Sequence, residues 1–394
     1  MSAPLKVLVV GNFAGDRQES MQRFAALLTS GLSGRGHTVT TLQPVARLAR
    51  LAGSYRYGGL PKYLGYVDKF VLFPRRLRRT LRAAPVDVVH VADHANAAYA
   101  AAAAPVPTLA TVHDLLQVRA ARGEFPQQRV GRFGRAQQAW ILRHIGRLPH
   151  AACVSEKTLT DVLGLTRLRP DQVSCVPNAL NYPYTPLPVT NARNRVTALL
   201  RERGLDPGHV TLQQGGYLLH VGGAQWYKNR PGLLRIYAAL RATMAPVPAL
   251  LVVGKPLDPH DAELARALGV APHLLHLSDV TNSDLQALYS AAEGFLFPSL
   301  QEGFGWPVAE AQACCCPVFT SNRAPLTEVG GDAAGYFDPT DPAAAAAAIA
   351  AGLADRSTLI RRGLIQAQRW TVPAMLEKYE ACYRTLIAAT RSTR

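Results

Sequence analysis

The first half of the chain alternates short apolar runs with segments of helical periodicity. Ser20 to Leu32 repeats apolar positions at helical spacing, whereas the runs around it are short and rich in valine and other strand-forming residues. The predicted strands of this half are Lys6 to Val10, His37 to Leu42, Val86 to Val91, Thr108 to Val112, Ala151 to Ser155 and Val173 to Val176. Strands alternating with helices indicate a parallel sheet, whose ligands bind beyond the carboxyl ends of the strands.

The same alternation begins again after a Pro- and Asn-rich stretch from Val176 to Asn194, which we interpret as a linker. The second half contains the predicted strands Tyr217 to Val221, Ala249 to Val253, Leu274 to Leu277, Gly294 to Phe297 and Val318 to Thr320. It also contains the predicted helices Arg230 to Arg241, Asn282 to Ala292 and Ala343 to Ala351. A chain of 394 residues is too long for one ordinary core, so we expect two α/β domains.

The lengths of the apolar runs and the spacing of the cysteines indicate a cytoplasmic protein with no metal site. No apolar run reaches the roughly 18 residues of a membrane-spanning helix, and the first residues lead straight into a strand, so we expect a cytoplasmic protein. The cysteines lack a paired C-x-x-C pattern, and three of them, Cys314 to Cys316, are adjacent. We expect reduced, structural thiols.

Positive charge is concentrated in the first half of the chain. Residues 1–195 contain 26 Lys and Arg against 10 Asp and Glu, and the remainder contains 17 against 17. One segment holds ten basic residues and a single acid, Asp68; the basic residues are Arg47, Arg50, Arg56, Lys62, Lys69, Arg75, Arg76, Arg78, Arg79 and Arg82. This segment predicts docking on an anionic membrane surface or attraction of an acidic soluble acceptor. We expect no nucleic-acid binding, because no aromatic platform or DNA-binding motif accompanies the charge.

The stretch from Pro298 to Asn322 places two carboxylates around a glycine turn at a predicted helix start. Gly303 and Gly305 allow close approach of the backbone to a ligand, and Pro307 suits the first turn of a helix beginning near Trp306. The free amides of such a helix bind anions such as phosphate. Glu302 and Glu310 would accept hydrogen bonds from hydroxyls on either side of the phosphate. A ligand with hydroxyls on both sides of a phosphate is a sugar nucleotide.

The spacing of Glu302 and Glu310 resembles the E-x7-E signature of retaining glycosyltransferases with the GT-B fold, particularly glycosyltransferase family 4. The resemblance implies two Rossmann-like domains facing a cleft: an acceptor domain (residues 1–190), a donor domain (205–370) and a last helix (371–394) crossing back to the first domain. It implies that Glu302 contacts the donor sugar and Glu310 the nucleotide ribose. The turn of Gly303, Phe304 and Gly305 would meet the phosphates.

A lysine after the first strand of the second half is a second candidate for the donor site. Lys228 could stabilise charge on the departing diphosphate. Family members usually add an arginine at the places that here hold Gly223 and Tyr227, and Arg230 is a candidate substitute. The donor residues implied by the resemblance also include Gly222, Gly223, Lys255, Val280 and Thr327.

The first half contributes a histidine and a loop. His113 follows a predicted strand and matches the histidine that the family places near the transferred sugar, where it could donate a hydrogen bond to a hydroxyl. Gly15, Asp16 and Arg17 are candidates for the acceptor side. His90, Asp93 and His94 are explained as the polar end of a strand. No D-x-D sequence occurs, which argues against a metal-dependent glycosyltransferase.

These features predict a metal-independent, retaining transfer of a hexose from a UDP or GDP sugar to a hydroxyl of a glycan or lipid-linked acceptor, with no cofactor. A sugar phosphorylase, a nucleotide-sugar epimerase and a membrane-associated scaffold with an inactive cleft remain as alternatives. An NAD-dependent dehydrogenase is disfavoured, because no G-x-G-x-x-G follows Lys6 to Val10. The sequence identifies neither the acceptor nor the oligomeric state.

Overall fold

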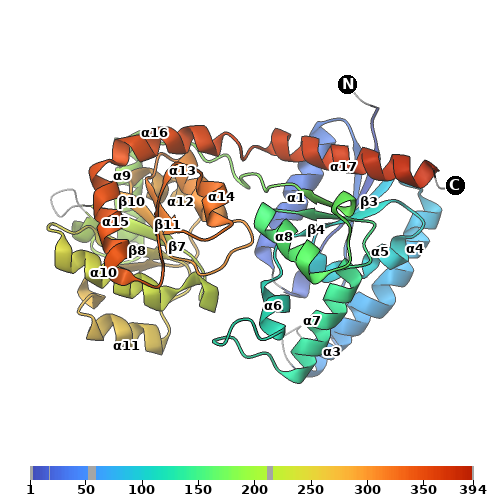
Figure 1. Ribbon diagram of the computed structural model, residues 1–394, viewed down its shortest axis with the longest axis horizontal. Helices are drawn as coiled ribbons and strands as arrows, with labels where there is room; N and C mark the ends of the chain where they lie inside the picture. Colours follow the sequence, from blue (N-terminus) through green and yellow to red (C-terminus); the bar gives the residue numbers. More distant parts are fainter. Residues whose placement is uncertain (1–2, 17, 52–58, 211–215, 393–394) are drawn as a thin grey trace. The chain divides into compact units, whose positions relative to one another are not determined.

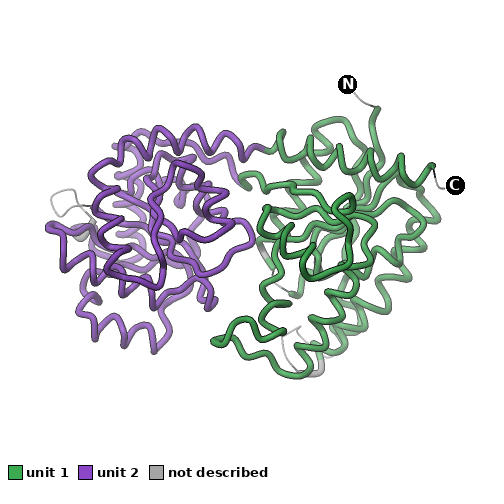
Figure 2. Tube along the Cα trace, viewed as in Figure 1, with its two compact units in different colours: residues 1–181, 372–394 green, residues 182–371 purple. Residues whose placement is uncertain are grey.

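The computed structural model describes residues 3–16, 18–51, 59–210 and 216–392. The chain divides into two compact units, shown in Figure 2. Unit 1 comprises residues 1–181 and 372–394, and unit 2 comprises residues 182–371. Each unit is an α/β body with its own parallel sheet (Figure 1). Unit 2 is therefore inserted, in sequence, between two parts of unit 1.

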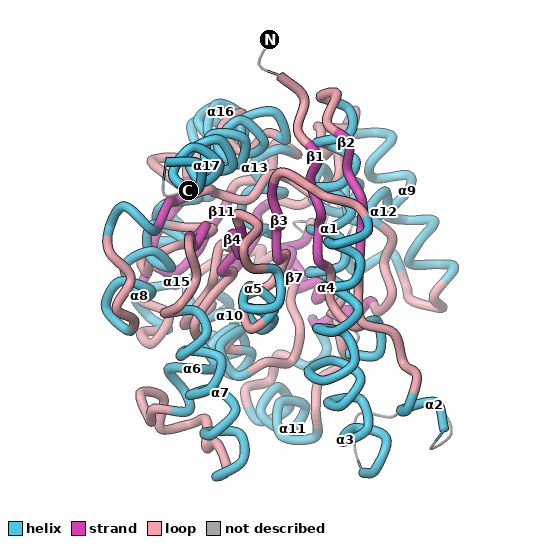
Figure 3. Tube along the Cα trace, turned by 90° about the vertical axis from the view of Figure 1, so that its right-hand side faces the viewer, coloured by secondary structure: helices cyan, strands magenta, loops and turns pink. Residues whose placement is uncertain are grey.

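The described residues of unit 1 form a six-stranded parallel sheet in the order β2-β1-β3-β4-β5-β6. Its strands are β1 (Lys6–Val10), β2 (Thr38–Leu42), β3 (Val88–Val91), β4 (Thr108–Val112), β5 (His150–Cys153) and β6 (Val173–Cys175). Its helices are α1 (Glu19–Gly34), α2 (Leu48–Leu51), α3 (Gly59–Val67), α4 (Phe73–Ala83), α5 (Tyr99–Ala103), α6 (Leu116–Ala121), α7 (Arg132–Ile145), α8 (Glu156–Leu165) and α17 (Val372–Ser392). In the turned view of Figure 3, β1 and β2 run side by side, with α1 next to them.

The strand order of unit 1 reverses between β1 and β3, which are both paired in parallel within the sheet interior. Ligands of doubly wound sheets bind beyond the carboxyl ends of the strands at such a reversal. Every residue of β3 and β4 is buried, as expected for strands covered by helices on both faces. The loops after β1, β3 and β4 are therefore the part of unit 1 best placed for function.

Helix α17 packs on α1 and on the sheet of unit 1. Gly31 of α1 leaves room for it, because a Cβ there would come within 2.7 Å of the side chain of Leu376. The carboxylate of Glu380 accepts a hydrogen bond from Nε of Arg35 at 2.6 Å, and the hydroxyl of Tyr383 lies 2.6 Å from Nδ1 of His90. These contacts join the last helix of the chain to the first part of the sequence.

The described residues of unit 2 form a second six-stranded parallel sheet, in the order β12-β11-β10-β7-β8-β9. Its strands are β7 (Tyr217–Val221), β8 (Ala249–Val253), β9 (Leu274–Leu277), β10 (Gly294–Phe297), β11 (Val318–Ser321) and β12 (Ala334–Phe337). Its helices are α9 (Val189–Glu202), α10 (Arg230–Thr243), α11 (Pro259–Ala267), α12 (Asn282–Ala291), α13 (Trp306–Ala313), α14 (Leu326–Gly330), α15 (Pro342–Ala354) and α16 (Arg356–Ala367). The order is that of a Rossmann sheet, and it reverses between β7 and β10.

The predicted linker from Val176 to Asn194 is wrong over its last residues, because α9 begins at Val189. The buried side chains of α9 are Ala192, Val196, Leu199 and Leu200, which lie on one face of the helix. This face packs against α12. The division between the two units, at Asn181 and Tyr182, precedes this helix, whereas the sequence suggested a first domain ending at residue 190.

The basic segment forms α2, α3, a π-helical segment η2 (Asp68–Leu72) and α4. Its one acid, Asp68, is buried and accepts hydrogen bonds from the backbone amides of Arg47, Leu48 and Ala49, all at 3.0 Å. Asp68 therefore caps α2 and adds no exposed negative charge. Arg56 lies outside the described residues.

Within the described residues, no single helix is long and apolar enough to cross a membrane. By length and composition alone, one bent pair of helices, Pro342–Ala354 with Arg356–Ser392, meets that test.

Candidate functional site

The carboxylate pair identified in the sequence lies at the strand-order reversal of unit 2. β10 ends at Phe297, the loop carries Glu302, and α13 begins at Trp306 with Glu310 in its second turn. Gly305 has φ of 101° and would place a Cβ 2.6 Å from the side chain of Leu326. A residue with a side chain is excluded there by both conformation and space, so the tight approach to α13 requires glycine.

Lys228 and Glu302 form an ion pair between the loops that follow the two adjacent strands β7 and β10. Nζ of Lys228 lies 2.7 Å from Oε1 of Glu302, and the two side chains are only 13% and 9% exposed. Nζ also lies 4.8 Å from the centre of the Phe297 ring. The sequence proposed separate roles for these two residues, and the structure brings their charges into direct contact although they are 74 positions apart.

Glu310 is buried, with an exposed fraction of 6%. Its Oε2 accepts a hydrogen bond from the hydroxyl of Tyr289 at 3.0 Å. Burial raises the pKa of Tyr289 well above its ordinary value, so its hydroxyl stays protonated and donates a hydrogen bond to the carboxylate. The hydrogen bond fixes the orientation of the Glu310 carboxylate.

Two contacts that the sequence did not suggest hold the loops after β7 and β10 together. The carbonyl of Tyr227 accepts a hydrogen bond from the amide of Leu300 at 2.7 Å. Nδ2 of Asn229 donates to the carbonyl of Pro298 at 3.1 Å, and its Oδ1 accepts from the amide of Gly232. Asn229 has φ of 54°. Its role as the N-cap of α10 could have been predicted from the sequence, because an asparagine directly before Arg230 and Pro231 is typical of a helix start.

The sequence suggested Arg230 as a phosphate ligand, but in the structure its side chain contacts backbone carbonyls. Its guanidinium is buried and donates to the carbonyls of Gly222, Lys255 and Pro256 at 3.2, 2.6 and 2.9 Å. Burial lowers the pKa of Arg230 from its ordinary value. Because both terminal nitrogens are engaged with backbone carbonyls, Arg230 fastens the loops after β7 and β8.

The remaining donor candidates lie at the same edge of the sheet. Gly222 and Gly223 follow β7, and a Cβ on Gly254 would lie 2.1 Å from the carbonyl oxygen of Gly222, so these loops touch through their backbones. Lys255 is exposed after β8 and Val280 is half-buried after β9. Thr327 lies in α14. Phe304 is buried against Trp370, and Gly303 precedes it in the glycine turn.

His113 lies at the carboxyl end of β4 in unit 1 and is buried. Nε2 donates to the carbonyl of Ala92 at 2.9 Å. Burial lowers the pKa of His113, so the ring is neutral and Nδ1 is a hydrogen-bond acceptor. The expected donation to a sugar hydroxyl is therefore replaced by the ability to accept a hydrogen bond.

Asp93 forms a polar network beside β1 and β3 with Asn12 and Asn96, two residues that the sequence did not single out. Nδ2 of Asn12 donates to Oδ2 of Asp93 at 2.5 Å, and Nδ2 of Asn96 donates to Oδ1 of Asn12 at 3.1 Å. Burial raises the pKa of Asp93, but the nearby His94 and His113 and hydrogen bonds outweigh it, and the net shift is downward. Asn12 lies in the loop that the sequence did indicate, from Gly11 to Gln18.

Of the three acceptor-side candidates, the structure describes Gly15 and Asp16. Gly15 and Asp16 lie in a short 3-10 helix, η1 (Ala14–Asp16), and the carboxylate of Asp16 pairs with Nζ of Lys69 at 2.5 Å. Asp16 therefore joins the loop after β1 to the basic segment. Arg17 lies outside the described residues.

One cluster outside these sites has the composition of a cation site. Oxygen or nitrogen atoms of Asp258, His260 and Asp261, at the start of α11, lie within 4.8 Å of one another. Asp258 also accepts a hydrogen bond from the amide of Asp261 at 2.8 Å, which is an ordinary helix cap.

Comparison with known proteins covers both units. Residues 209–369 match the family described as "Glycosyl transferases group 1", and residues 21–182 match "Glycosyltransferase Family 4". The chain is 36% identical over 161 residues to the O-antigen chain mannosyltransferase B of Escherichia coli, covering 40% of this chain and 42% of that protein. It is 31% identical over 299 residues to a D-inositol 3-phosphate glycosyltransferase of Salinispora arenicola, covering 70% of this chain and 63% of that protein. The matched part thus spans less than two thirds of either relative.

Solved structures resemble the chain over nearly its whole length. The sucrose-phosphate synthase of Thermosynechococcus elongatus has a TM-score of 0.72 at 18% identity, with 98% of this chain and 100% of that chain covered. The Anabaena protein HepE in complex with UDP and glucose has a TM-score of 0.68 at 14% identity, with 97% and 100% covered.

Proposed function

Because the chain belongs to the group 1 glycosyltransferases of the family 4 type and has their GT-B fold, we propose that it transfers a hexose from a nucleoside diphosphate sugar to an acceptor hydroxyl, with retention. The observation that carries the proposal is the buried ion pair of Lys228 and Glu302 at the reversal of the unit 2 sheet. It lies beside a glycine turn that opens a helix, where a diphosphate is favoured.

The proposed chemistry proceeds by front-face substitution. The bond between the anomeric carbon and the diphosphate oxygen breaks, and the acceptor oxygen bonds to the same face of that carbon. The acceptor proton passes to the departing diphosphate oxygen. Lys228 and the first amides of α13 would stabilise the charge on the leaving group as it develops, which is where preorganised cations lower a barrier most.

In this proposal donor binding rearranges the ion pair. Glu302 would exchange its contact with Lys228 for hydrogen bonds from hydroxyls of the sugar, and Lys228 would turn to the diphosphate. Glu310, oriented by Tyr289, would accept hydrogen bonds from the ribose. In unit 1, Nδ1 of His113 would accept a hydrogen bond from a sugar hydroxyl.

The names of the relatives support a role in making cell-surface polysaccharide or glycolipid. The relatives include a mannosyltransferase of O-antigen chains and a glycosyltransferase acting on D-inositol 3-phosphate, and a structural neighbour binds UDP. We propose a UDP or GDP donor and a glycan or lipid-linked acceptor. The absence of a D-x-D sequence supports a metal-independent reaction.

Nucleotide affinity tests the donor site. By calorimetry, Lys228→Ala and Glu310→Ala should each weaken binding of UDP or GDP by about 1.5 to 3 kcal/mol, the effect of one charged hydrogen bond. Arg266→Ala and Glu263→Ala are matched controls, since they remove an exposed pair from α11. Unchanged affinity in both folded site variants would refute the assignment.

The same titration repeated with excess EDTA tests metal independence. Affinity and transfer should both survive the chelator. Loss of transfer that magnesium or manganese restores would point to an ion, and Asp258→Ala would then show whether the cluster on α11 holds it. Release of sugar 1-phosphate that depends on added phosphate would identify a phosphorylase instead.

We also propose that the basic segment attracts unit 1 to an anionic membrane surface beside a lipid-linked acceptor. Much of its apolar face packs inside unit 1: Phe73 and Leu77 are buried, and the ring of Phe70 lies 4.9 Å from that of Trp140. Tyr63 and Val71 remain 60% and 42% exposed. The exposed basic side chains of α4 are Arg75, Arg76, Arg78, Arg79 and Arg82.

Vesicle sedimentation tests this docking. Binding should require anionic lipid and weaken with salt, and changing Arg75, Arg76, Arg78 and Arg79 together to Gln should abolish most of it, at about 1 kcal/mol per charge. Arg361→Gln and Arg362→Gln, on α16 of unit 2, are the control: each removes one positive charge, as each substitution on α4 does, and should leave vesicle binding unchanged. Equal recovery with neutral vesicles, or no binding at low salt, would contradict the proposal.

A further inference from the structure

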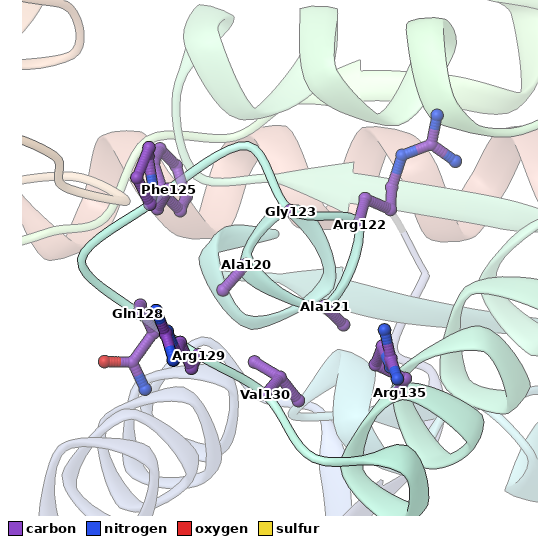
Figure 4. A pocket seen from close by; sticks show the side chains of 10 residues that line it. Ala120, Ala121, Arg122, Gly123, Phe125, Gln128, Arg129, Val130 and Arg135 are labelled. Atoms are coloured by element: carbon purple, nitrogen blue, oxygen red, sulfur yellow. The ribbon is translucent and has the colours of Figure 1, made fainter.

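The loop between α6 and α7 of unit 1 lines an open cavity of about 400 Å³ that no part of the proposed donor site uses. Its lining includes Arg122, Phe125, Gln128, Arg129, Val130 and Arg135. Figure 4 shows Arg129 and Arg135 on the two sides of Val130, while Arg122 extends in another direction. The cavity is thus polar and basic, with an aromatic ring in its wall.

The cavity carries an excess of positive charge. Residues 119–135 contain five arginines and one acid, Glu124. Glu124 is shared by Arg119 and Arg122, at 2.7 and 3.6 Å. Across the described parts of the chain, no ion pair or hydrogen bond engages the guanidinium groups of Arg129 and Arg135. Two positive charges therefore line the same cavity with no partner to balance them.

The start of α7 adds to this field. The helix spans 14 residues, its N-cap residue Gly131 provides no side-chain cap, and its first turn contains no acid. Arg132 and Arg135 lie in its first turns, where the partial positive charge of the helix makes a cation unfavourable. A bound anion would offset both the helix charge and the repulsion among the arginines.

We propose that this cavity binds a phosphate group of the acceptor. Arginine forks match phosphate oxygens, and two unbalanced charges match a phosphomonoester. The assignment to the acceptor rests on the proposed function. It also uses the position of the cavity: α6 begins three residues after His113, and its six residues span roughly 9 Å. A phosphorylated sugar or a phosphorylated lipid head group placed near the end of β4 would reach the cavity with its phosphate.

Protection from phenylglyoxal, which modifies exposed arginines, tests the site residue by residue. Inorganic phosphate should slow modification of Arg129 and Arg135 several-fold, as followed by peptide mass spectrometry of the intact protein. Arg201 on α9 and Arg235 on α10 are exposed internal references and should react at an unchanged rate. Equal rates at Arg129 and Arg135 with and without phosphate, or equal slowing at all four arginines, would overturn the proposal.

Further probes distinguish the source of the phosphate. Glucose 6-phosphate should protect and glucose should not if the acceptor is soluble, whereas protection only by vesicles containing phosphatidic acid, compared with phosphatidylcholine vesicles, would assign the phosphate to a lipid. Arg129→Gln with Arg135→Gln should lose binding of the protecting probe, and Arg201→Gln with Arg235→Gln, at exposed positions of unit 2, should retain it. Retention in the first pair would overturn the proposal.

The nucleotide titration separates this proposal from the proposed function. Normal nucleotide binding without protection at the cavity would overturn only the phosphate site. Protection at the cavity in a protein that binds no nucleotide would overturn the proposed function, and the assignment of the phosphate to an acceptor with it.

Discussion

Units 1 and 2 share a parallel sheet with a reversal of strand order, but the polar groups at the two reversals differ in kind. In unit 2 an acid and a base from adjacent loops neutralise each other, through Lys228 and Glu302. In unit 1 the corresponding edge holds the buried carboxylate of Asp93, which accepts a hydrogen bond from the amide of Asn12, and the neutral ring of His113. The shared architecture thus provides the edge, and the residue types at the strand ends determine which ligands the edge can bind.

The largest expected effect concerns the ion pair of unit 2. Lys228→Met and Glu302→Gln should each lower the rate of transfer about 10²- to 10³-fold, as observed when a preorganised electrostatic group is removed from an active site. Release of nucleoside diphosphate measures the rate. The double variant Lys228→Glu with Glu302→Lys restores an ion pair with reversed polarity, so it should fold and remain inactive. Activity in that double variant would mean that the pair only supports the loops.

The second prediction uses a buried histidine in the sheet of each unit. Burial lowers the pKa of His90 in unit 1 to about 3 and that of His220 in unit 2 to about 4, from 6.5. Below pH 6.5 these two histidines bind protons in the unfolded chain but remain neutral in the folded chain. The free energy of unfolding should therefore fall as pH falls toward 4. Each histidine contributes up to about 1.4 kcal/mol per pH unit.

Urea unfolding from pH 7 to pH 5 measures this slope. His90→Phe and His220→Phe should each flatten it, whereas His260→Phe, at an exposed position of α11, should not. Identical slopes in all three variants would show that buried histidines do not govern the acid sensitivity of either unit.

The smallest expected effect concerns the attachment of α17 to unit 1. Glu380→Gln replaces the carboxylate that faces Arg35 and His37, and should cost on the order of 1 kcal/mol, because Arg35 is partly exposed. Glu377→Gln removes a longer and more exposed contact with the same arginine, at 3.9 Å, and should cost less. The urea midpoints of the two variants measure the difference, and a reversed order would refute this account of the attachment.

Most strands, the glycine turn and both glutamates could be predicted from the sequence because each depends on residues that are close together along the chain; the edge strand β12 was missed. Short apolar runs predict β7 and β10, and Pro307, two residues after Gly305, predicts the start of α13. Helix α9 was missed because prolines before it and asparagines in its first turns obscure a helical pattern that extends well past Asn194.

The contacts among the candidate site residues join distant positions, so local pattern could not predict them. The pairing of Lys228 with Glu302 depends on β7 and β10 being neighbours in the sheet. The role of Arg230 depends on three carbonyls from two loops, and the pairing of Asp16 with Lys69 on a contact between η1 and η2. Which nitrogen of His113 accepts a hydrogen bond depends on the carbonyl of Ala92.

The placement of α17 affects the order in which the protein can be completed during synthesis. All of unit 2 emerges from the ribosome before the helix that supplies Tyr379 and Tyr383, whose hydroxyls meet Thr111 and His90 in unit 1. Domains generally fold as units as the chain is made, and unit 2 is a continuous stretch of sequence. Until α17 arrives, the buried polar groups of the first sheet lack those partners. The strands of unit 1 are therefore synthesised before unit 2, but their final packing has to wait until unit 2 has been made.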